Sequence, residues 1–397
     1  MITRGSAEFR RVNLAMVTAG FATFELMYCV QPLLPVFVRA FSVTPLGASL
    51  ALSLTTGSLA LSLLIASAVS ETLGRTPMMI ASILLAGILT IASSLIGQWG
   101  SFLLMRAAIG VVLSGLPAVA MAYVAEEVDR ESIGLAMGLY VAGSGFGGMT
   151  GRLLTELIAG AAGWRVAVAA VGAIGLASGL VVMAALPRSR HFIPRRWGLR
   201  QLAFNYIEHC RDPALAPLFL EAFLIMGGFV SVYNYVTFRL LGPHFHLSAA
   251  RVGLIFVVYL VGVVSSAWVG AIAGRVGRAR ALPVAIGVEL LGVLLTLSGH
   301  LDIVVLGIAL VTFGFFGAHS VASSWVGLRA RANRAQAAAL YLFLYYLGSS
   351  VIGSVSGVFY GRAGWDGVVG FIALLLVGAL AVARLVSILP SRSRAVM

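Results

Sequence analysis

Long apolar runs recur along the whole chain, and each is long enough to cross the hydrocarbon core of a bilayer, which takes about 20 residues as a helix. Period-two alternation is absent, so we expect helices and not barrel strands, with the backbone hydrogen bonds satisfied inside each span. We predict about twelve spans, at 12–38, 46–68, 77–97, 101–125, 133–158, 164–187, 216–241, 250–273, 281–299, 302–326, 335–360 and 366–389.

The composition indicates the same environment. Hydrophobic residues make up 60% of the 397 residues and charged residues only 10%, whereas soluble domains carry about 25% charged residues. The two cysteines, Cys29 within a span and Cys210 in the middle loop, are too few for a disulfide framework and are expected to be free thiols. The sequence therefore predicts an all-α integral membrane protein.

The basic residues give the orientation. The chain has no lysine, and on the twelve-span interpretation most of its 27 arginines fall in alternate loops, so both termini and the long middle loop are predicted to be cytoplasmic. The net charge of +13 is then a topology signal, and we expect no nucleic-acid partner. The middle loop is either a solvated linker or a contact for anionic lipid. The arginines on the predicted cytoplasmic side are Arg4, Arg10, Arg11, Arg75, Arg188, Arg190, Arg195, Arg196, Arg200, Arg211, Arg275, Arg278, Arg280, Arg329, Arg331, Arg334, Arg392 and Arg394.

The chain also repeats itself. A near-constant offset at matching loop positions indicates two parallel halves of about six helices each, at 1–187 and 216–397, joined by a linker at 188–215. Parallel repeats of this kind place a substrate path between the halves, near the bilayer midplane. The matching pairs are Gly74-Arg75 with Gly277-Arg278, Gly115 with Gly317, and Gly163-Trp164 with Gly364-Trp365.

This layout resembles the major facilitator superfamily over essentially the whole chain. SAVSETLGRTP (67–77) and GAIAGRVGRAR (270–280) are similar to its loop motif after spans two and eight. LLMRAAIG (103–110) resembles the motif of its fourth helix, and GSGFGGMTGR (143–152) the antiporter motif of its fifth. Together with YCVQPLLP (28–35), GFFGAHSVASSW (314–325) and YLFLYYLGSS (341–350), the pattern looks most like bacterial inner-membrane drug or arabinose efflux permeases. The resemblance implies a monomer in the inner membrane, driven by a proton gradient without a cofactor.

Some motif positions depart from the family pattern. Glu71 replaces the aspartate that is held to lock the cytoplasmic side, and Gly274 replaces the acid of the second copy, which weakens that lock. Gly148 replaces a proline and Arg152 a glycine in the antiporter motif. Ser67 and Thr72 replace the glycine and arginine of the first loop motif.

We assign gating or structural roles to residues of these motifs. Gly147 and Gly151 have the small-x-x-x-small spacing of a tight helix contact, which we expect to face the other half. Arg152 lies toward the predicted periplasmic end, where it either pairs with Glu156 or closes an outer gate, or else contacts an anionic substrate. The full set is Glu71, Gly74, Arg75, Gly147, Gly151, Arg152, Arg275, Gly277 and Arg278.

Three ionisable residues inside spans are candidates for proton coupling. Glu25 lies midway along the first span, where burial favours the neutral form of an unpaired carboxyl and a nearby arginine favours the charged form. The resemblance makes Arg106 on the fourth span its expected partner; a static ion pair is the alternative. His319 on the tenth span titrates near neutral pH when unperturbed, although a lone histidine is also a common packing element.

Polar and aromatic residues on the central spans are candidates for a substrate cavity. Asn234 within a span is expected to hydrogen-bond either to another helix or to a ligand, and the tyrosines are either cavity-lining residues or interface anchors. The resemblance implies that Glu289, on the ninth span, is peripheral and faces the bilayer. The cavity candidates are Tyr28, Gln31, Tyr123, Asn234, Tyr235, Tyr341 and Tyr345.

These features indicate a transporter and argue against an enzyme. The catalytic motifs H-E-x-x-H, G-x-S-x-G, the P-loop and a strand-borne G-x-G-x-x-G are absent from the sequence, and we predict no metal site. The prediction is a secondary transporter that exports small organic molecules, drug-, sugar- or siderophore-like, in exchange for protons by alternating access. The alternative is proton-coupled uptake of an organic anion, with Arg106 or Arg152 as its counter-charge.

Overall fold

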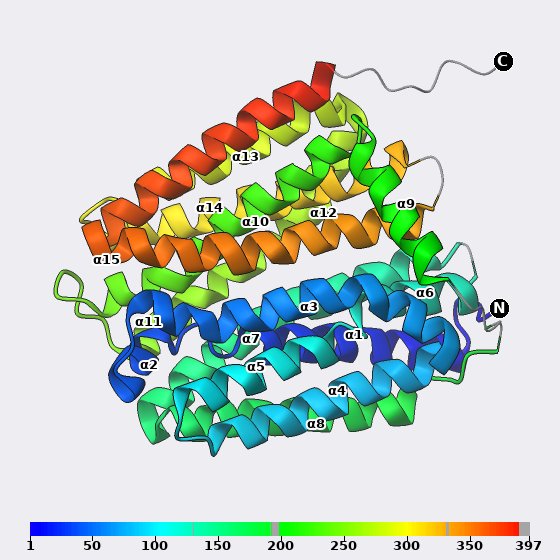
Figure 1. Ribbon diagram of the computed structural model, residues 1–397, viewed down its shortest axis with the longest axis horizontal. Coiled ribbons are helices and arrows are strands. Elements are labelled where there is room, and N and C mark those ends of the chain that lie inside the picture. The colour runs from blue at the N-terminus through cyan, green and yellow to red at the C-terminus, as the bar shows by residue number, and fades with distance from the viewer. Residues whose placement is uncertain (130, 191, 193–197, 331–332, 389–397) are drawn as a thin grey trace. The chain divides into compact units, whose positions relative to one another are not determined.

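A computed structural model describes residues 1–129, 131–190, 192, 198–330 and 333–388, and within these ranges the regular secondary structure is helical apart from one isolated bridge between Ile2 and Val128 (Figure 1). This confirms the predicted all-α class. The side chain of Ser67 and five of the arginines used for the orientation lie outside the described part: Arg195, Arg196, Arg331, Arg392 and Arg394.

The helices of the first half follow the predicted spans. The first predicted span forms two helices and the fourth forms two, because Pro35 and Pro117 lack the N–H that a continuous helix needs and therefore stand at helix starts. The helices are α1 (Ala7–Tyr28), α2 (Leu34–Phe41), α3 (Pro45–Leu73), α4 (Arg75–Ser94), α5 (Trp99–Leu113), α6 (Pro117–Glu127), α7 (Ile133–Ala162) and α8 (Trp164–Ala185).

The remaining helices include a short one in the middle loop. Each predicted span again falls on a helix or on consecutive helices, and the last two spans lie in one assigned helix that kinks at Ala363 and Gly364. The helices are α9 (Leu199–Arg211), α10 (Ala216–Leu241), α11 (Ala249–Ile255), η1 (Phe256–Val258), α12 (Tyr259–Val276), α13 (Arg278–Leu295), α14 (Leu301–Arg329) and α15 (Arg334–Ile388).

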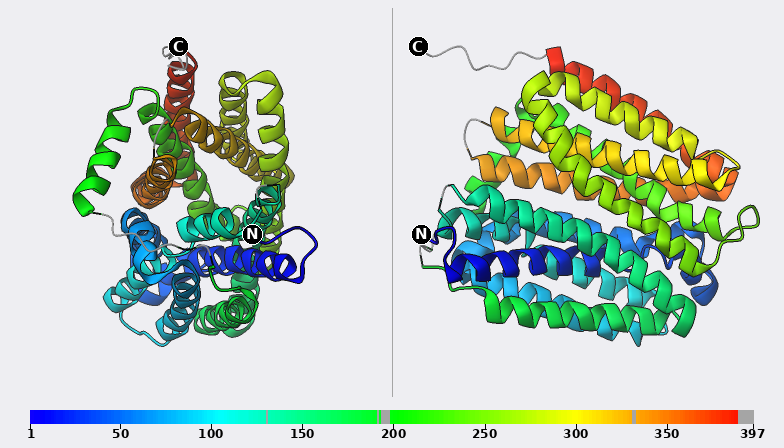
Figure 2. Two further views of the ribbon diagram at one scale, coloured as in Figure 1. Left: turned by 90° about the vertical axis from the view of Figure 1, so that its right-hand side faces the viewer. Right: turned by 180° about the vertical axis from the view of Figure 1, so that it is seen from behind.

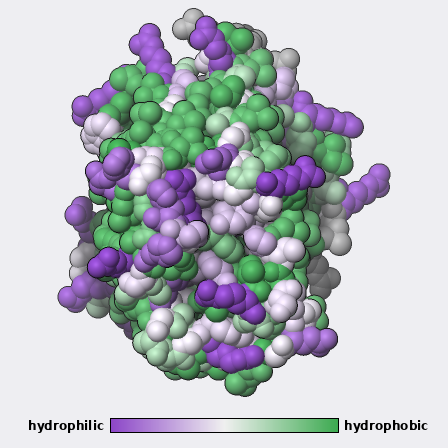
Figure 3. Space-filling model, turned by 90° about the vertical axis from the view of Figure 1, so that its left-hand side faces the viewer, coloured by the Kyte–Doolittle hydropathy of each residue, from purple (hydrophilic) through white to green (hydrophobic). Residues whose placement is uncertain are grey.

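Seven helices of the described chain are long and apolar enough to cross a membrane by length and composition. They include α15, which carries two predicted spans. Polar residues gather on the end of the molecule where the chain turns between helices, as a space-filling view of that end shows (Figure 3). This arrangement is typical of helices whose ends meet water.

The chain divides into two compact units. The first contains Met1–Arg196 and Leu240–Leu260, and the second contains Trp197–Arg239 and Val261–Met397. The first unit includes the short segment around α11, because α11 packs on α7. The predicted linker at 188–215 contains the helix α9, and its limits stay a prediction.

The internal repeat is visible in the backbone. Gly74 and Gly277 have φ angles of 93° and 91°, and Gly163 and Gly364 have φ angles of 86° and 59°. Residues with side chains rarely adopt these angles, so glycine at these four places allows one helix to end and the next to begin at once. Two of the three matched pairs found in the sequence therefore place a glycine with positive φ at the same helix junction in both halves.

A close helix contact repeats as well. In the first unit α1 lies beside α7 and α8 (Figure 2), and a β-carbon at Gly147 of α7 would lie 2.6 Å from the Cα of Phe21 on α1. In the second unit a β-carbon at Gly348 of α15 would lie 2.8 Å from the Cα of Phe223 on α10. Phe21 and Phe223 thus correspond, as do Gly147 and Gly348.

This contact corrects one prediction. Gly147 and Gly151 pack against α1 of their own unit, with Gly151 against the backbone of Glu25, and not against the other half. The spacing of small residues correctly indicated a tight contact, but it contains no information about which helix is the partner. Glycine is needed here because the neighbouring atoms are backbone atoms that cannot rotate away.

Candidate functional site

Glu25 lies in the interior of the first unit. Its side chain projects from α1 near the helix end at Tyr28, it is 0% exposed, and neither carboxyl oxygen has a hydrogen-bond partner among the described residues. A buried carboxylate without partners is strongly disfavoured relative to the neutral acid, because no donor or cation replaces its lost hydration. Glu25 therefore has the environment of a proton-binding group.

Arg106 does not pair with Glu25 in this structure, contrary to the sequence prediction. Its fully buried guanidinium on α5 donates to three backbone carbonyl oxygens, those of Ala51 at 3.1 Å, Met27 at 2.8 Å and Leu26 at 3.4 Å. Leu26 and Met27 belong to the last turn of α1, whose carbonyls have no intrahelical donor. Arg106 thus completes the end of α1 and ties it to α3 and α5.

Arg152 forms the centre of a buried polar site in the first unit. Its Nε donates to the side-chain oxygen of Gln31 at 2.6 Å, and its Nη1 donates to the carbonyl of Gly148 at 2.5 Å. Its guanidinium carbon lies 4.3 Å from the ring centre of Tyr28 and 4.7 Å from that of Tyr259. These cation–π contacts place a fully buried positive charge between two aromatic rings.

The sequence predicted two members of this site, Tyr28 and Gln31, but it offered the wrong neighbour for Arg152. The stem of Glu156, which the sequence offered as the ion-pair partner of Arg152, packs against Gly253 of α11. Tyr259 was missed because it lies more than 100 residues away, on a span without charged residues near it. Only the fold brings it to Arg152.

In the second unit, the structure brings together three predicted residues. His319 on α14 lies 3.0 Å through its Nδ1 from the hydroxyl oxygen of Tyr341 on α15. The ring of Tyr345, one turn further along α15, lies 4.8 Å from the imidazole centre. His319 is therefore hydrogen-bonded and packed among aromatic rings, as its predicted packing role requires, and its role in proton coupling stays a prediction.

Asn234 and Tyr235 join two helices of the second unit. The Asn234 amide and the Tyr235 hydroxyl both donate to the carbonyl of Gly353, at 3.5 and 3.2 Å. Asn234 thus forms the cross-helix hydrogen bond that was one of its two predicted roles.

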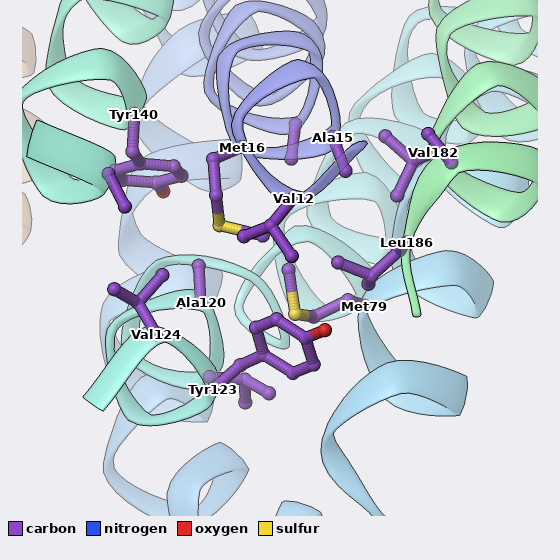
Figure 4. Packing of buried hydrophobic residues seen from close by; sticks show 14 of the residues in the cluster. Val12, Ala15, Met16, Met79, Ala120, Tyr123, Val124, Tyr140, Val182 and Leu186 are labelled. Carbon is purple, nitrogen blue, oxygen red and sulfur yellow. The ribbon is translucent and has the colours of Figure 1, made fainter. Parts of the chain in front are cut away.

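Tyr123 was predicted to line a substrate cavity, but the structure places it elsewhere. It lies in the apolar cluster of the first unit, among Val12, Met79 and Leu186 (Figure 4). Its hydroxyl donates to the carbonyl of Pro187 at 3.0 Å, at the end of α8. The residue is 0% exposed, and its ring fills the interior of the unit. We therefore assign it to the core rather than to a substrate cavity.

The first loop motif forms an ion-pair network within its own unit. Arg75 bonds Glu126 at 2.9 Å and lies 3.6 Å from Glu71, and it also donates to the hydroxyl of Ser70. In the second copy, Arg278 donates to the hydroxyl of Ser324 at 3.0 Å. Arg275 is exposed beside Gly277. The second copy lacks the acid, and its arginine Arg278 contacts a serine hydroxyl where Arg75 takes part in an ion-pair network.

Glu289 is not at the periphery, which corrects another prediction. It is 0% exposed inside the second unit, and so is Glu221 of α10. All four of their carboxyl oxygens lack a hydrogen-bond partner among the described residues. Hydropathy alone did not indicate this, because α13 is apolar on most of its surface and its sequence does not show which side faces the bundle.

Comparison with known proteins identifies the family. The sequence model of the Major Facilitator Superfamily matches residues 16–326, which is most of the chain. The chain belongs to the Major Facilitator Superfamily. It is a multi-pass membrane transporter, and such a transporter binds small-molecule substrates within the membrane and is not an enzyme.

Named relatives share most of their length with this transporter. It is 46% identical over 381 residues to the inner membrane transport protein YnfM of Escherichia coli, covering 96% of this chain and 91% of that protein. It is 45% identical over 379 residues to the MFS-type transporter YybF of Bacillus subtilis, covering 96% and 94%.

Solved structures show the same fold. A bacterial homologue of the human lysosomal transporter Spinster, in an inward-facing and unoccupied conformation, superposes with a TM-score of 0.79 at 15% identity. The match covers 96% of this chain and 98% of that one. At this identity the likeness concerns the fold alone, and it agrees with the predicted major facilitator architecture.

Proposed function

We propose that this superfamily member is a proton-coupled exporter of small organic molecules. It acts as a monomer in the bacterial inner membrane, with both termini cytoplasmic, and it alternates the access of a central site between the two sides. The direction is supported by the resemblance of GSGFGGMTGR (143–152) to the antiporter motif. The driving force is the proton gradient, and no cofactor takes part.

Glu25 is the observation that carries the proposal. An exchanger needs a group whose protonation differs between two conformations. In the conformation described above, the Glu25 carboxyl is fully buried without a hydrogen-bond partner, so it holds its proton there. When the unit opens to water, hydration stabilises the carboxylate and the proton leaves. Protonation and substrate binding then exclude one another, which couples the two fluxes.

The proposed substrate contacts are polar and aromatic side chains of both units. In the first unit they are Arg152, Tyr28 and Gln31, and in the second unit His319 and Tyr345. Ring faces and hydrogen-bonding groups together suit an amphipathic organic molecule. Drug-, sugar- and siderophore-like compounds all fit this description, so we assign the substrate to this broad class.

Everted membrane vesicles provide the test. Respiration acidifies their interior and quenches a fluorescent amine, and a compound that is exchanged for protons restores the fluorescence. The compounds to be tested are drug-, sugar- and siderophore-like molecules. We expect some of them to restore fluorescence with the wild-type protein and not with Glu25→Gln. Recovery by the variant as large as by wild type would refute the role of Glu25. Glu208→Gln, which changes an exposed carboxyl on α9, is the matched control.

A second function is favoured by Arg152 specifically. A buried guanidinium between two tyrosine rings is suited to binding a carboxylate or sulfonate, since charge-assisted hydrogen bonds add to ring contacts. The protein would then take up an organic anion together with protons. In that case Arg152→Gln abolishes transport while Glu25→Gln does not, whereas the exporter is expected to lose exchange in Glu25→Gln.

A further inference from the structure

Two buried carboxyls remain outside the site described so far. Glu221 of α10 and Glu289 of α13 are both 0% exposed, and none of their four carboxyl oxygens has a hydrogen-bond partner within the described ranges. Burying an ionised carboxylate inside a membrane span is costly, and such residues are usually functional. The positions of the two carboxyls within the second unit indicate their role.

Glu289 reaches from α13 across to α10. Its Oε1 lies 3.8 Å from the place where a β-carbon at Gly228 would stand, and Ile372 and Leu376 of α15 border the same place. Because Gly228 has no side chain, the carboxyl is able to lie against the α10 backbone. The acid is thus directed into the interior of the unit.

Glu221 lies on the same face of α10. It precedes Gly228 by seven residues, which is two helical turns or roughly 10 Å along the axis. At a separation of this order two carboxylates inside the low-dielectric interior would still repel each other. Two like charges in such surroundings are not both ionised, so at least one of the two acids carries a proton.

A hydrogen bond joins two polar side chains of neighbouring helices in the same unit. The Tyr341 hydroxyl of α15 lies 3.0 Å from His319 Nδ1 on α14. A phenol both donates and accepts a hydrogen bond, and an imidazole does the same through its two nitrogens. None of the carboxyl oxygens of Glu221 and Glu289 takes part in it within the described ranges.

Charged and titratable groups on the packed helices do not neutralise the pair. Arg329 of α14 donates to the backbone carbonyls of Ala214 and Val386 and interacts electrostatically with Asp212. On α10 the Tyr233 hydroxyl shares a hydrogen bond with Thr312 at 2.7 Å. The groups that face the acids are Tyr341 and, beyond it, His319 with Tyr345.

The internal repeat relates the position of Glu289 in the second half to that of Glu25 in the first. Phe21 corresponds to Phe223, so Glu25 corresponds to Gly227, which lies next to Gly228. The second half has no acid at the position equivalent to Glu25, but Glu289 brings a carboxyl to the same level of its first helix. Each half thus contains an unpartnered buried acid at the corresponding depth.

We propose that Glu221 and Glu289 form a second proton-binding site, confined to the second unit. The two acids hold at least one proton while they are buried and exchange it when the unit opens to water. This deepens the proposed function and rests on it, since the transport cycle then moves protons through both halves. The site itself is testable without a substrate.

Infrared titration of the purified protein in liposomes tests the site. Protonated carboxylic acids have a carbonyl band that carboxylates lack, and its intensity is followed against pH for wild type, Glu221→Gln, Glu289→Gln and Glu25→Gln. We expect each replacement to remove part of the band, and each replacement within the pair to move the titration midpoint of the remaining acid. Glu25→Gln removes its part without moving the midpoints of the pair. Glu208→Gln is the control.

Two results overturn the proposal. One is a band that is unchanged in both Glu221→Gln and Glu289→Gln, and the other is a remaining acid whose midpoint ignores its partner. Should a variant fail to fold, reaction of the wild-type protein with a hydrophobic carbodiimide replaces it: modification of Glu221 or Glu289, located by mass spectrometry, supports the site, and modification of neither refutes it. Vesicle transport that ignores the pH gradient refutes the proposed function and leaves the infrared result standing.

Discussion

Replacing Gly147 with alanine tests the close contact between α1 and α7 quantitatively. The new β-carbon would lie 2.6 Å from both the Cα and the carbonyl carbon of Phe21, whereas ordinary contacts begin at 3.4 Å. The carbonyl oxygen of Phe21 would lie closer still, so the helices must separate by more than about 0.8 Å at this point, and overpacking of this kind costs about 1–3 kcal/mol. Alanine recovers about 0.5–1 kcal/mol of helix propensity, so the net destabilisation is about 0–2.5 kcal/mol.

Gly138→Ala is the matched control, since it lies on the same helix and a β-carbon there meets nothing within 4 Å. It should stabilise the protein by the propensity gain of about 0.5–1 kcal/mol alone. The assay is reversible denaturation in mixed micelles, which gives the free energy of unfolding of each variant. A Gly147→Ala variant at least as stable as Gly138→Ala would contradict the close helix contact.

Three further predictions follow from the same structure. Arg106→Met should lower the free energy of unfolding by about 1.5–3 kcal/mol or more, because buried carbonyls lose a charged donor, and an unchanged midpoint in the same denaturation assay would contradict this. Gly74→Ala and Gly277→Ala should each cost about 1–3 kcal/mol through the positive φ, and equal stability to wild type would show that these turns adapt. Cys210 is exposed and Cys29 buried, so maleimide should label only Cys210 in the folded protein. Partial burial raises the pKa of the Cys210 thiol, and the thiolate is the reacting form. The labelling rate of Cys210 should therefore rise at higher pH than that of a free cysteine. Coincident pH profiles of the two labelling rates would refute this.

The sequence predicted the spans and the repeat because both depend on local signals. The length of an apolar run determines whether a helix crosses a bilayer, and the turns at Gly74 and Gly163 recur at Gly277 and Gly364 because only glycine takes those angles easily. These features need no knowledge of which helices are neighbours.

The partners of the site residues were harder to predict, for physical reasons. Arg106 bonds backbone carbonyls, which every residue possesses and no motif marks. Tyr259 reaches Arg152 only through the packing of η1 on α7. Glu289 was expected to face the lipid, because a mostly apolar helix does not reveal its inner face in its sequence. Tyr123 was assigned to a cavity when its ring belongs to the core.

The most direct test of the account uses Glu25→Gln in proteoliposomes with a substrate found in the vesicle screen. We predict that the variant does not exchange labelled for unlabelled substrate at equal pH on both sides, because a neutral glutamine mimics the protonated acid, which excludes substrate. It should fail to accumulate substrate when a pH gradient is imposed, whereas wild type and Glu208→Gln accumulate it. Gradient-driven accumulation by Glu25→Gln equal to that of wild type would contradict the central claim that protonation of Glu25 drives transport.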